Sequence, residues 1–284
     1  MRSWCDGAAT SAFHHYVVLA ELTTGWERDV AVGDTLLRRY LFHHAALGAA
    51  FTLAGGGRAL DADDVSMTDL GRPGGYFNGT VLLQPPADWD AVLARIEHFL
   101  HGGRGQACLW SAWPTPDLHT RGWRLAGHPP LLARPPLATN PVALPAAAGV
   151  DVRPVTSAAD LAHWERAAID GYPLPELHDA LPGAFAAPAL LDDERFRFFV
   201  GRDGVRPVAA GVSFVSHGIA SLAYGATVLA ARRRGFWRRM AVERLGAAPD
   251  VWTTGVFSDL SRPGAEALGF VPLLRLTLWI LDRP

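Results

Sequence analysis

The sequence predicts a mixed α/β protein made of two similar domains in tandem, each with a mostly antiparallel mixed sheet flanked by helices. The chain of 284 residues is 49% hydrophobic and 19% charged, which is enough for two ordinary domains with real cores. A proline-rich segment over 134–145 divides it, as a stiff linker would. The parts on either side of this segment end in similar patterns, which indicates a duplication.

The similar endings share five features in the same order. A short apolar strand is followed by a serine, a proline-containing helix start, a Gly-aromatic pair and a Pro-Leu-Leu stretch. The serine, the glycine and the first proline of that stretch lie at Ser111, Gly122 and Pro130 in the first half, and at Ser258, Gly269 and Pro272 in the second. We therefore predict a first domain over 1–134, a linker over 135–149 and a second domain over 150–284.

The second half shows an alternation of strand and helix patterns. Ser157 is a candidate N-cap for the first helix, Asp203-Gly204 is a hairpin signal, and His217-Gly218 is a second turn. The predicted elements, in order, are a strand over 150–155, helices over 158–172 and 176–185, strands over 196–201, 207–215 and 220–229, a helix over 237–245, a strand over 251–257, a helix starting near 262 and an apolar strand after 270.

Composition and charge narrow the function classes. The net charge of −2 gives no general reason to expect nucleic acid or an anionic membrane as a partner. The two cysteines favour a reduced setting without a disulfide framework. The first residues form no signal-type apolar run, and no segment reaches the roughly 18 apolar residues of a membrane span. We expect a cytoplasmic protein that acts on a small molecule, and its oligomeric state stays open.

The segment over 231–239 carries the clearest functional signal. It holds five arginines and Gly235, and it lies between a predicted strand and a predicted helix. A helix N-terminus presents free N–H groups and a positive dipole end, so this arrangement favours a pyrophosphate site. The alternative is a solvated helix start, although five neighbouring arginines repel one another without an anion or carboxylate partner.

This segment resembles the coenzyme A loop of the GNAT superfamily of N-acetyltransferases, written Arg/Gln-x-x-Gly-x-Gly/Ala. Arg232 and Gly235 match, whereas Trp237 stands where the family has a very small residue. The order of elements over about 150–282 also resembles the family, as does the closing Gly-Phe. The first half lacks the basic loop and resembles the fold only in its last third, which implies a domain that has lost its cofactor site.

The resemblance implies transfer of an acyl group from acetyl-CoA or another acyl-CoA to an amine of a small molecule. It also implies that catalysis is mostly positioning of two bound substrates, helped by deprotonation of the amine. The pantetheine arm would lie along Thr227, Val228 and Leu229, and the pyrophosphate would face Arg232, Arg233, Arg234, Gly235, Phe236 and Trp237.

Two departures from the family keep other functions open. An indole at Trp237 either points outward or fills the phosphate site. The family often has a tyrosine four residues before the Gly-Phe, as the acid for the leaving thiolate, and this chain has Ala265. One alternative is a degenerate GNAT-fold enzyme that no longer uses CoA and catalyses decarboxylation, cyclisation or proton transfer on a biosynthetic intermediate. Another is a non-catalytic ligand-binding protein.

Four residues are candidates for catalysis by their expected place in the cleft: Tyr172, His178, Tyr224 and Asp259. A tyrosine and a histidine near one cleft move protons at neutral pH. The structural alternatives are that Tyr172 ends a helix, that His178 lies on the surface, and that Asp259 caps the helix near residue 262.

No metal site is predicted. The adjacent pairs His14-His15 and His43-His44 have poor ligand geometry, because neighbouring side chains diverge on a helix or strand. A joint site across both pairs remains a lesser alternative. Trp110 is interpreted as packing between domains instead of a ligand-binding cage.

Overall fold

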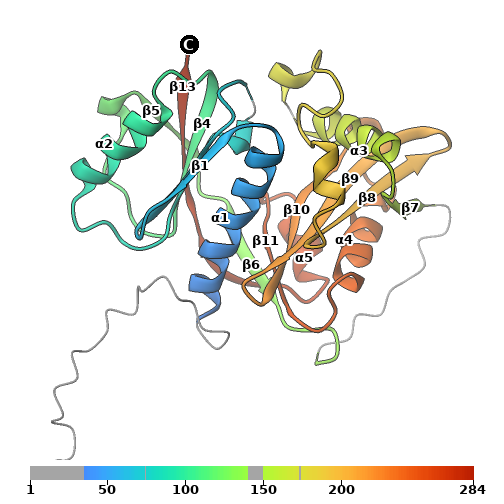
Figure 1. Cartoon of the computed structure of the whole chain (residues 1–284). Helices are drawn as coiled ribbons and strands as arrows, with labels where there is room; N and C mark the ends of the chain where they lie inside the picture. The colour runs from blue at the N-terminus through green and yellow to red at the C-terminus, as the bar shows by residue number, and fades with distance from the viewer. Residues whose placement is uncertain (1–34, 74, 140–149, 173) are drawn as a thin grey trace, which may run out of the picture.

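The computed structural model describes residues 35–73, 75–139, 150–172 and 174–284, which form two mixed sheets with helices around them (Figure 1). The first half contains α1 (Leu36–Ala54), β1 (Arg58–Asp61), β2 (Val65–Asp69), β3 (Gly79–Leu82), α2 (Trp89–Leu100), β4 (Gly105–Ser111), β5 (Trp123–Gly127) and β6 (Pro130–Arg134). The second contains β7 (Asp151–Pro154), α3 (Ala158–Gly171), β8 (Phe196–Asp203), β9 (Arg206–Ser216), β10 (Ile219–Thr227), α4 (Phe236–Gly246), β11 (Trp252–Val256), α5 (Arg262–Glu266), β12 (Val271–Arg275) and β13 (Thr277–Arg283).

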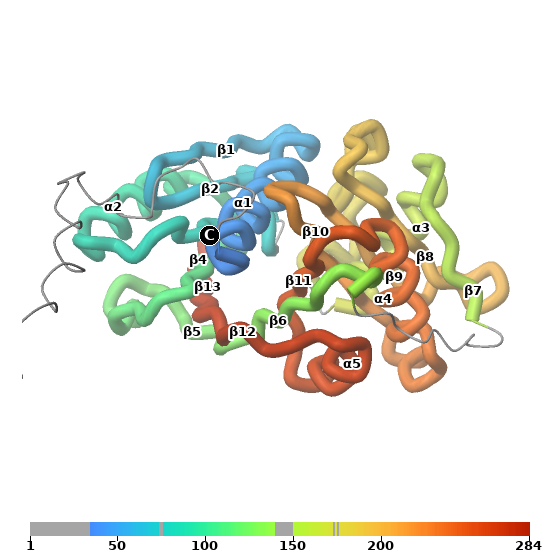
Figure 2. The backbone as a smooth tube through the Cα atoms, turned by 90° about the horizontal axis from the view of Figure 1, so that it is seen from below, coloured from blue at the N-terminus to red at the C-terminus, as the bar shows by residue number. Residues whose placement is uncertain are grey.

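The two halves exchange their last strands. The first sheet has the order β1-β2-β3-β4-β13-β5, and the second has the order β12-β6-β11-β10-β9-β8-β7. Strand β6 of the first half therefore lies between β11 and β12, whereas β13 from the chain end lies between β4 and β5 (Figure 2). The predicted ranges 1–134 and 150–284 thus differ from the two sheets, because each sheet takes one strand from the other half.

A buried arginine anchors each exchanged strand. At the end of β13, Arg283 donates from Nη1 to the Asp69 carboxylate (3.1 Å) and from Nε to the Gly105 carbonyl (3.0 Å). At the end of β6, Arg134 donates from Nε to the Leu268 carbonyl (2.7 Å). Because a buried guanidinium needs such partners, these bonds fix the exchange.

The predicted duplication is confirmed by the sheets, but one of its matches is wrong. Gly122 and Gly269 both have left-handed φ, of 81° and 86°, and they precede the equivalent strands β5 and β12. The two Pro-Leu-Leu stretches, in contrast, lie in β6 and β12, which are antiparallel neighbours in one sheet. By position in the sheets, the counterpart of β6 is β13.

Most predicted elements of the second half are present, including α3, which Ser157 caps through its side chain. The helix predicted over 176–185 is wrong, since only short 3-10 turns form at Pro175–Leu177 and Pro188–Leu191. Glu165 on α3 explains the difference, because its carboxylate accepts hydrogen bonds from the N–H groups of Gly183, Phe185 and Ala186. The limited likeness expected of the first half is also wrong: α1 and three strands precede α2 there.

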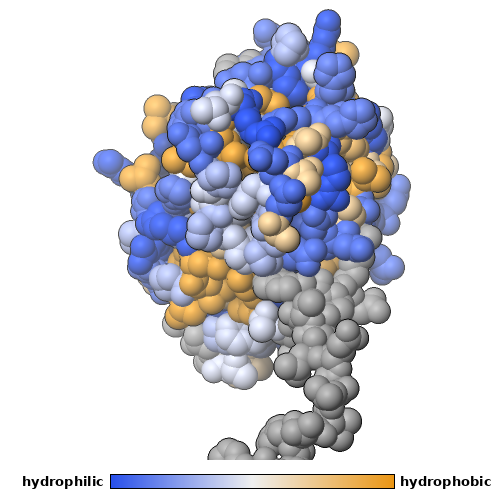
Figure 3. All heavy atoms as spheres, turned by 90° about the vertical axis from the view of Figure 1, so that its left-hand side faces the viewer, coloured by the Kyte–Doolittle hydropathy of each residue, from blue (hydrophilic) through white to orange (hydrophobic). Residues whose placement is uncertain are grey.

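Helix α1 joins the halves into one body. It packs on β2 and β3 of the first sheet and on β9 and β10 of the second (Figure 2). Leu47 and Phe51 on this helix share a core cluster with Trp164 and Phe198 of the second half. The outer face of the first half is largely hydrophilic with separate apolar patches (Figure 3). None of the helices that the structure describes is long and apolar enough to cross a membrane.

Candidate active site

A large cavity lies where the two halves meet, with a volume of about 1210 Å³. Strands β10 and β11 are paired in parallel only from Ile219 to Ser221, opposite Trp252 to Thr254, and β10 then continues to Thr227 without β11. The cavity opens along this divergence. Its other wall comes from α1, β2, β3 and β4 of the first half. The volume exceeds the roughly 300–1,000 Å³ of common ligand pockets, which leaves room for two substrates.

A bulge in β10 shapes the middle of the cavity. The register against β9 shifts between Ala223 and Ala226, and Tyr224 has a left-handed φ of 47°. The Tyr172 hydroxyl donates to the Gly225 carbonyl over 3.1 Å. Bulges redirect backbone groups, so a stretch of β10 that pairs with neither neighbour faces the cavity.

The loop after β10 ends in a helix start that suits an anion. Gly235 is the N-cap of α4 with φ 89°, and no side chain caps the helix there. The first N–H groups of α4 therefore lack intrahelical acceptors, and they lie at the positive end of the helix dipole. Arg233, with φ 63°, and Arg238 line the cavity beside them.

The five arginines of this loop have different partners. Arg234 forms two hydrogen bonds to Asp203 (2.6 and 2.9 Å), outside the cavity lining, and Arg239 pairs with Glu243. Arg232 donates to the Thr227 carbonyl (3.1 Å). Within the part of the chain that the structure describes, no ion pair is found for Arg233 or Arg238. These two exposed guanidinium groups are the ones left for an anionic ligand.

The Trp237 indole is directed toward α5. A Cβ atom added to Gly264 would lie 2.8 Å from Cζ3 of the indole, and the Phe257 ring centroid is 6.4 Å away. The indole packs on the cluster that includes Leu245 and Phe270. It forms part of the cavity wall, and Gly264 makes room for it.

The structure brings together some of the predicted site residues. Tyr172 and Tyr224 line the cavity, and burial raises the pKa of both phenols. Thr227, Leu229 and the loop residues also line it, except for Arg234. Val228 instead packs into a core cluster with Phe236 and Met240.

His178 and Asp259 do not reach the cavity lining. His178 is exposed, and its carbonyl accepts a hydrogen bond from Arg166. Asp259 is exposed and pairs with Arg275 at 2.6 Å, which lowers the pKa of its carboxyl. The expectation that Asp259 caps α5 is wrong, because the hydroxyls of Ser258 and Ser261 bond to each other and to the backbone N–H groups there.

Sequence reasoning missed the aromatic wall supplied by the first half. Four rings form a row in which neighbouring centroids are 5.3–6.3 Å apart: Tyr40, His44, Trp110 and Tyr76. The row continues to Tyr172 of the second half at 6.5 Å. Burial lowers the pKa of His44 to about 4, so this imidazole is neutral at pH 7. The expectation that Trp110 only packs between domains is therefore incomplete, since it also lines the cavity.

Arg244 was missed as well. It is 2% exposed, lines the cavity, and donates to the carbonyls of Ala223 (3.1 Å) and Met240 (3.2 Å). Burial lowers the pKa of its guanidinium to about 10. The helical spacing of Phe236, Met240 and Arg244 was the available signal, because it places this arginine on the buried face.

The described residues contain no cluster of three or more metal-ligating side chains. His43 Nδ1 bonds to Ser216, whereas His44 contacts Tyr40 and Trp110, so the two imidazoles have different surroundings. His14 and His15 lie outside the described residues. Cys108 is buried and free, and burial raises the pKa of its thiol to about 12.

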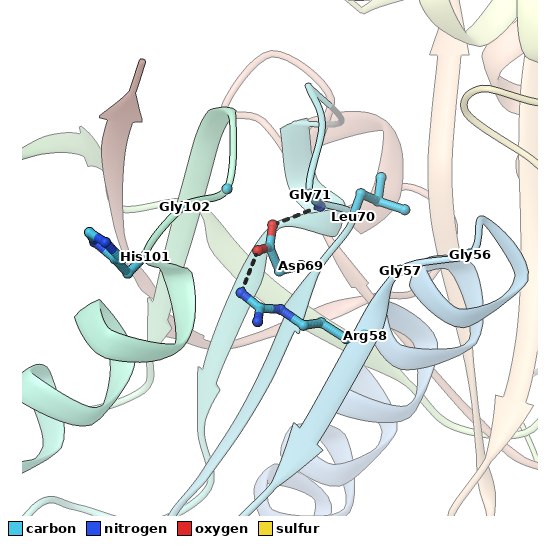
Figure 4. Close-up of a pocket in the computed structure, with 9 residues that line it drawn as sticks. Gly56, Gly57, Arg58, Asp69, Leu70, Gly71, His101 and Gly102 are labelled. Carbon is cyan, nitrogen blue, oxygen red and sulfur yellow. Dashed lines mark hydrogen bonds and ion pairs between the residues drawn. The ribbon is translucent and has the colours of Figure 1, made fainter.

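A second, shallower hollow lies in the first half, and its chemistry is structural (Figure 4). Its buried carboxylate, Asp69, accepts hydrogen bonds from Arg58 (3.1 Å) and from the Gly71 N–H (3.0 Å), in addition to the bond from Arg283. The carboxylate is thus satisfied by groups that hold the sheet together.

Comparisons with known proteins identify the fold. No protein-family model matches the chain, and no curated protein matches its sequence. Among solved structures, a GCN5-related N-acetyltransferase from Kribbella flavida is similar with a TM-score of 0.55 and 20% identity, over 85% of this chain and 96% of that one. A GNAT-family protein from Novosphingobium aromaticivorans has a TM-score of 0.55 and 16% identity, over 88% and 100% of the two chains.

A conserved protein of unknown function from Staphylococcus epidermidis is also similar, with a TM-score of 0.58 and 12% identity over 80% of this chain and 95% of that one. These similarities extend over both halves and over nearly the whole length of each solved chain. The protein therefore has the fold of the GNAT superfamily, built twice in tandem.

Proposed function

We propose that this protein transfers an acyl group from a CoA thioester to an amine of a small molecule. The observation that carries the proposal is the divergence of β10 from β11, which leads directly to the uncapped N-terminus of α4 at Gly235. Arg233 and Arg238, for which the described residues supply no ion pair, lie at the same cavity. The acetyltransferases among the structural neighbours support the same reaction class.

The residues present fit the parts of an acyl-CoA. The diphosphate suits the free N–H groups of α4 together with Arg233 and Arg238, because helix N-termini and guanidinium groups both bind phosphate oxygens. The pantetheine arm suits the backbone of β10 between Tyr224 and Thr227, on the side where β11 no longer pairs with it. The Trp237 indole is turned toward Gly264, so it leaves the Gly235 turn accessible to the diphosphate.

The thioester supplies an electrophilic acyl carbonyl, and the protein holds this carbonyl against the amine. Tyr172 and Tyr224 have raised pKa values, so both phenols stay protonated at neutral pH and act as hydrogen-bond donors instead of bases. The Tyr172 hydroxyl already donates to Gly225 and thereby fixes the bulge. Catalysis would rest chiefly on the relative orientation of the two substrates.

The experiment is a calorimetric titration of acetyl-CoA into the wild type and three variants. Arg233→Ala and Arg238→Ala should each weaken binding by about fivefold to tenfold, roughly 1.0–1.4 kcal/mol, because each guanidinium loses an exposed phosphate contact. Arg234→Ala is the matched control, since this arginine lies on the same loop but bonds to Asp203 outside the cavity.

Equal affinities for all four proteins would remove the loop from the site. Absence of binding in the wild type at millimolar acetyl-CoA would reject the proposal. It would favour a GNAT-fold enzyme that does not use CoA or a protein that only binds a ligand.

A further inference from the structure

We infer that the acceptor of this reaction is a weakly basic aromatic amine, uncharged at neutral pH, held against the ring row of the first half. This inference rests on the proposed acyl transfer and names its acceptor class. Two observations carry it: the described residues that line the cavity include no carboxylate, and a row of aromatic side chains lies opposite β10.

No aspartate or glutamate is found among the lining residues in the described part of the chain. The charged side chains that line the cavity are all arginines: Arg232, Arg233, Arg238 and Arg244. Arg244 is buried beneath the β10 bulge, with backbone carbonyls as its hydrogen-bond acceptors. A positively charged acceptor would therefore meet like charge from these lining side chains.

The wall opposite β10 is aromatic with neutral polar groups between the rings. Tyr40, His44, Trp110 and Tyr76 form the row, and the hydroxyls of Ser66 and Thr68 lie on the neighbouring strand. Ring contacts with an aromatic ligand favour offset or edge-to-face geometry and stabilise binding beyond what buried area alone contributes. The wall is thus suited to a planar ligand of low polarity.

Cation–π contact alone would not offset the cost of removing an ammonium group from water in this cavity. Such a contact contributes less than the cost of removing an ammonium ion from water, which stays large even after the protein relaxes. An aromatic amine avoids this cost, because its nitrogen carries no charge at neutral pH. It also needs no strong base to deprotonate it before reaction, and His43 and His44, with pKa values lowered to about 3 and about 4, are weak bases.

The reaction balances without a further reactant. The nitrogen lone pair forms the new C–N bond at the acyl carbon, and the electron pair of the C–S bond leaves with sulfur. The proton lost from nitrogen ends on that sulfur, so the products are an anilide and free CoA thiol.

The test compares 4-ethylaniline with its isomer 2-phenylethylamine. The two amines have the same formula and one benzene ring each, but only the second is protonated at pH 7. With acetyl-CoA and the full-length protein, we expect kcat/KM for 4-ethylaniline to be at least tenfold higher. We also expect Trp110→Leu to lower this kcat/KM about tenfold without changing acetyl-CoA affinity. Trp252→Leu, at a tryptophan of β11 outside the lining, is the matched control.

Three results would overturn the inference: faster acetylation of 2-phenylethylamine, acetylation of neither amine by protein that binds acetyl-CoA, or equal loss in the two tryptophan variants. A second variant keeps the inference testable if the Trp110→Leu protein fails to fold. Tyr76→Glu adds a carboxylate to the ring row and should shift the preference toward 2-phenylethylamine. Absence of acetyl-CoA binding by the wild type would instead reject the proposed function, and the acceptor class with it.

Discussion

The two halves of this protein build the same kind of sheet, but the helices that follow their central strands begin differently. In the first half, α2 is capped by Asp88, whose carboxylate accepts from the Ala91 N–H (3.1 Å), and Asp90 lies in its first turn. In the second half, α4 begins at Gly235 without a side-chain cap and is preceded by arginines. A carboxylate occupies the first helix N-terminus, where an anion would bind, whereas the second is open to a phosphate.

This comparison shows which part of the cavity each half contributes. The second half contains the helix start without a side-chain cap and the divergent strands β10 and β11. The first half supplies α1 and the aromatic wall, and its own helix N-terminus is closed by Asp88. The helices α2 and α4 follow equivalent strands, so the change of cap is the local difference between the two copies at this position.

The largest expected effect concerns the exchanged strand β13, which joins the second half to the first sheet. Arg283→Ala should lower the free energy of unfolding by about 3 kcal/mol, because the buried Asp69 carboxylate loses one of its two guanidinium partners. Arg275→Ala, at the end of β12, should cost much less, since its pair with Asp259 is exposed and screened by solvent. Chemical denaturation of both variants measures this difference, and equal losses would mean that Arg283 does not anchor β13.

The next effect tests the open helix start directly. Gly235→Asp should weaken acetyl-CoA binding about a hundredfold, roughly 2.7 kcal/mol, because it places at α4 the carboxylate that Asp88 places at α2. Gly204→Asp is the control, since Gly204 also has a left-handed φ (60°) but lies in the hairpin between β8 and β9. If the two variants bind acetyl-CoA equally well in calorimetry, a carboxylate at the start of α4 does not prevent binding, and the different caps of α2 and α4 do not explain which half binds the ligand.

The buried histidines of α1 predict a pH dependence that originates in the first half. The pKa values of His43 and His44 in the folded protein, about 3 and about 4, lie below the ordinary 6.5, so the unfolded chain binds more protons between these values. Stability is therefore fully present above pH 6.5 and falls below it, by about 1.4 kcal/mol per pH unit for each histidine.

Unfolding measured between pH 6.5 and pH 5 checks this expectation. His44→Gln should reduce the slope by about half, and His178→Gln, at an exposed position, should leave it unchanged. A wild-type slope that matches that of His44→Gln would show that His44 is not buried in neutral form.

The smallest effect belongs to the bulge. Tyr172→Phe removes the hydroxyl that donates to Gly225 and should cost about 1 kcal/mol in unfolding, with acetyl-CoA affinity unchanged. Thermal denaturation and calorimetry give the two values. A large loss of affinity with normal stability would instead mean that the hydroxyl contacts the ligand.

Local signals in the sequence predicted much of the second half. The cap at Ser157, the Asp203-Gly204 turn and the basic loop around Gly235 each act over a few residues, and the structure has all three. The Gly-aromatic pairs at Gly122 and Gly269 also marked equivalent positions, because both glycines have left-handed φ.

The features that were missed depend on contacts between distant segments. The exchange of β6 and β13 is a choice among similar apolar strands, and their sequences do not specify the sheet they join. The conformation of the turn over 178–186 depends on Glu165 of α3, which accepts hydrogen bonds from its backbone. The site residues Tyr40, Trp110 and Arg244 meet only after both halves have packed on α1 and α4, so no single motif contains them.

The most direct measurement is the stoichiometry of acetyl-CoA binding to the wild-type chain by calorimetric titration. We predict one molecule bound per chain, at the N-terminus of α4, and a thermal shift of several degrees at saturation. Two molecules per chain would contradict the closed role given to α2, and no binding at millimolar acetyl-CoA would contradict the open site at α4.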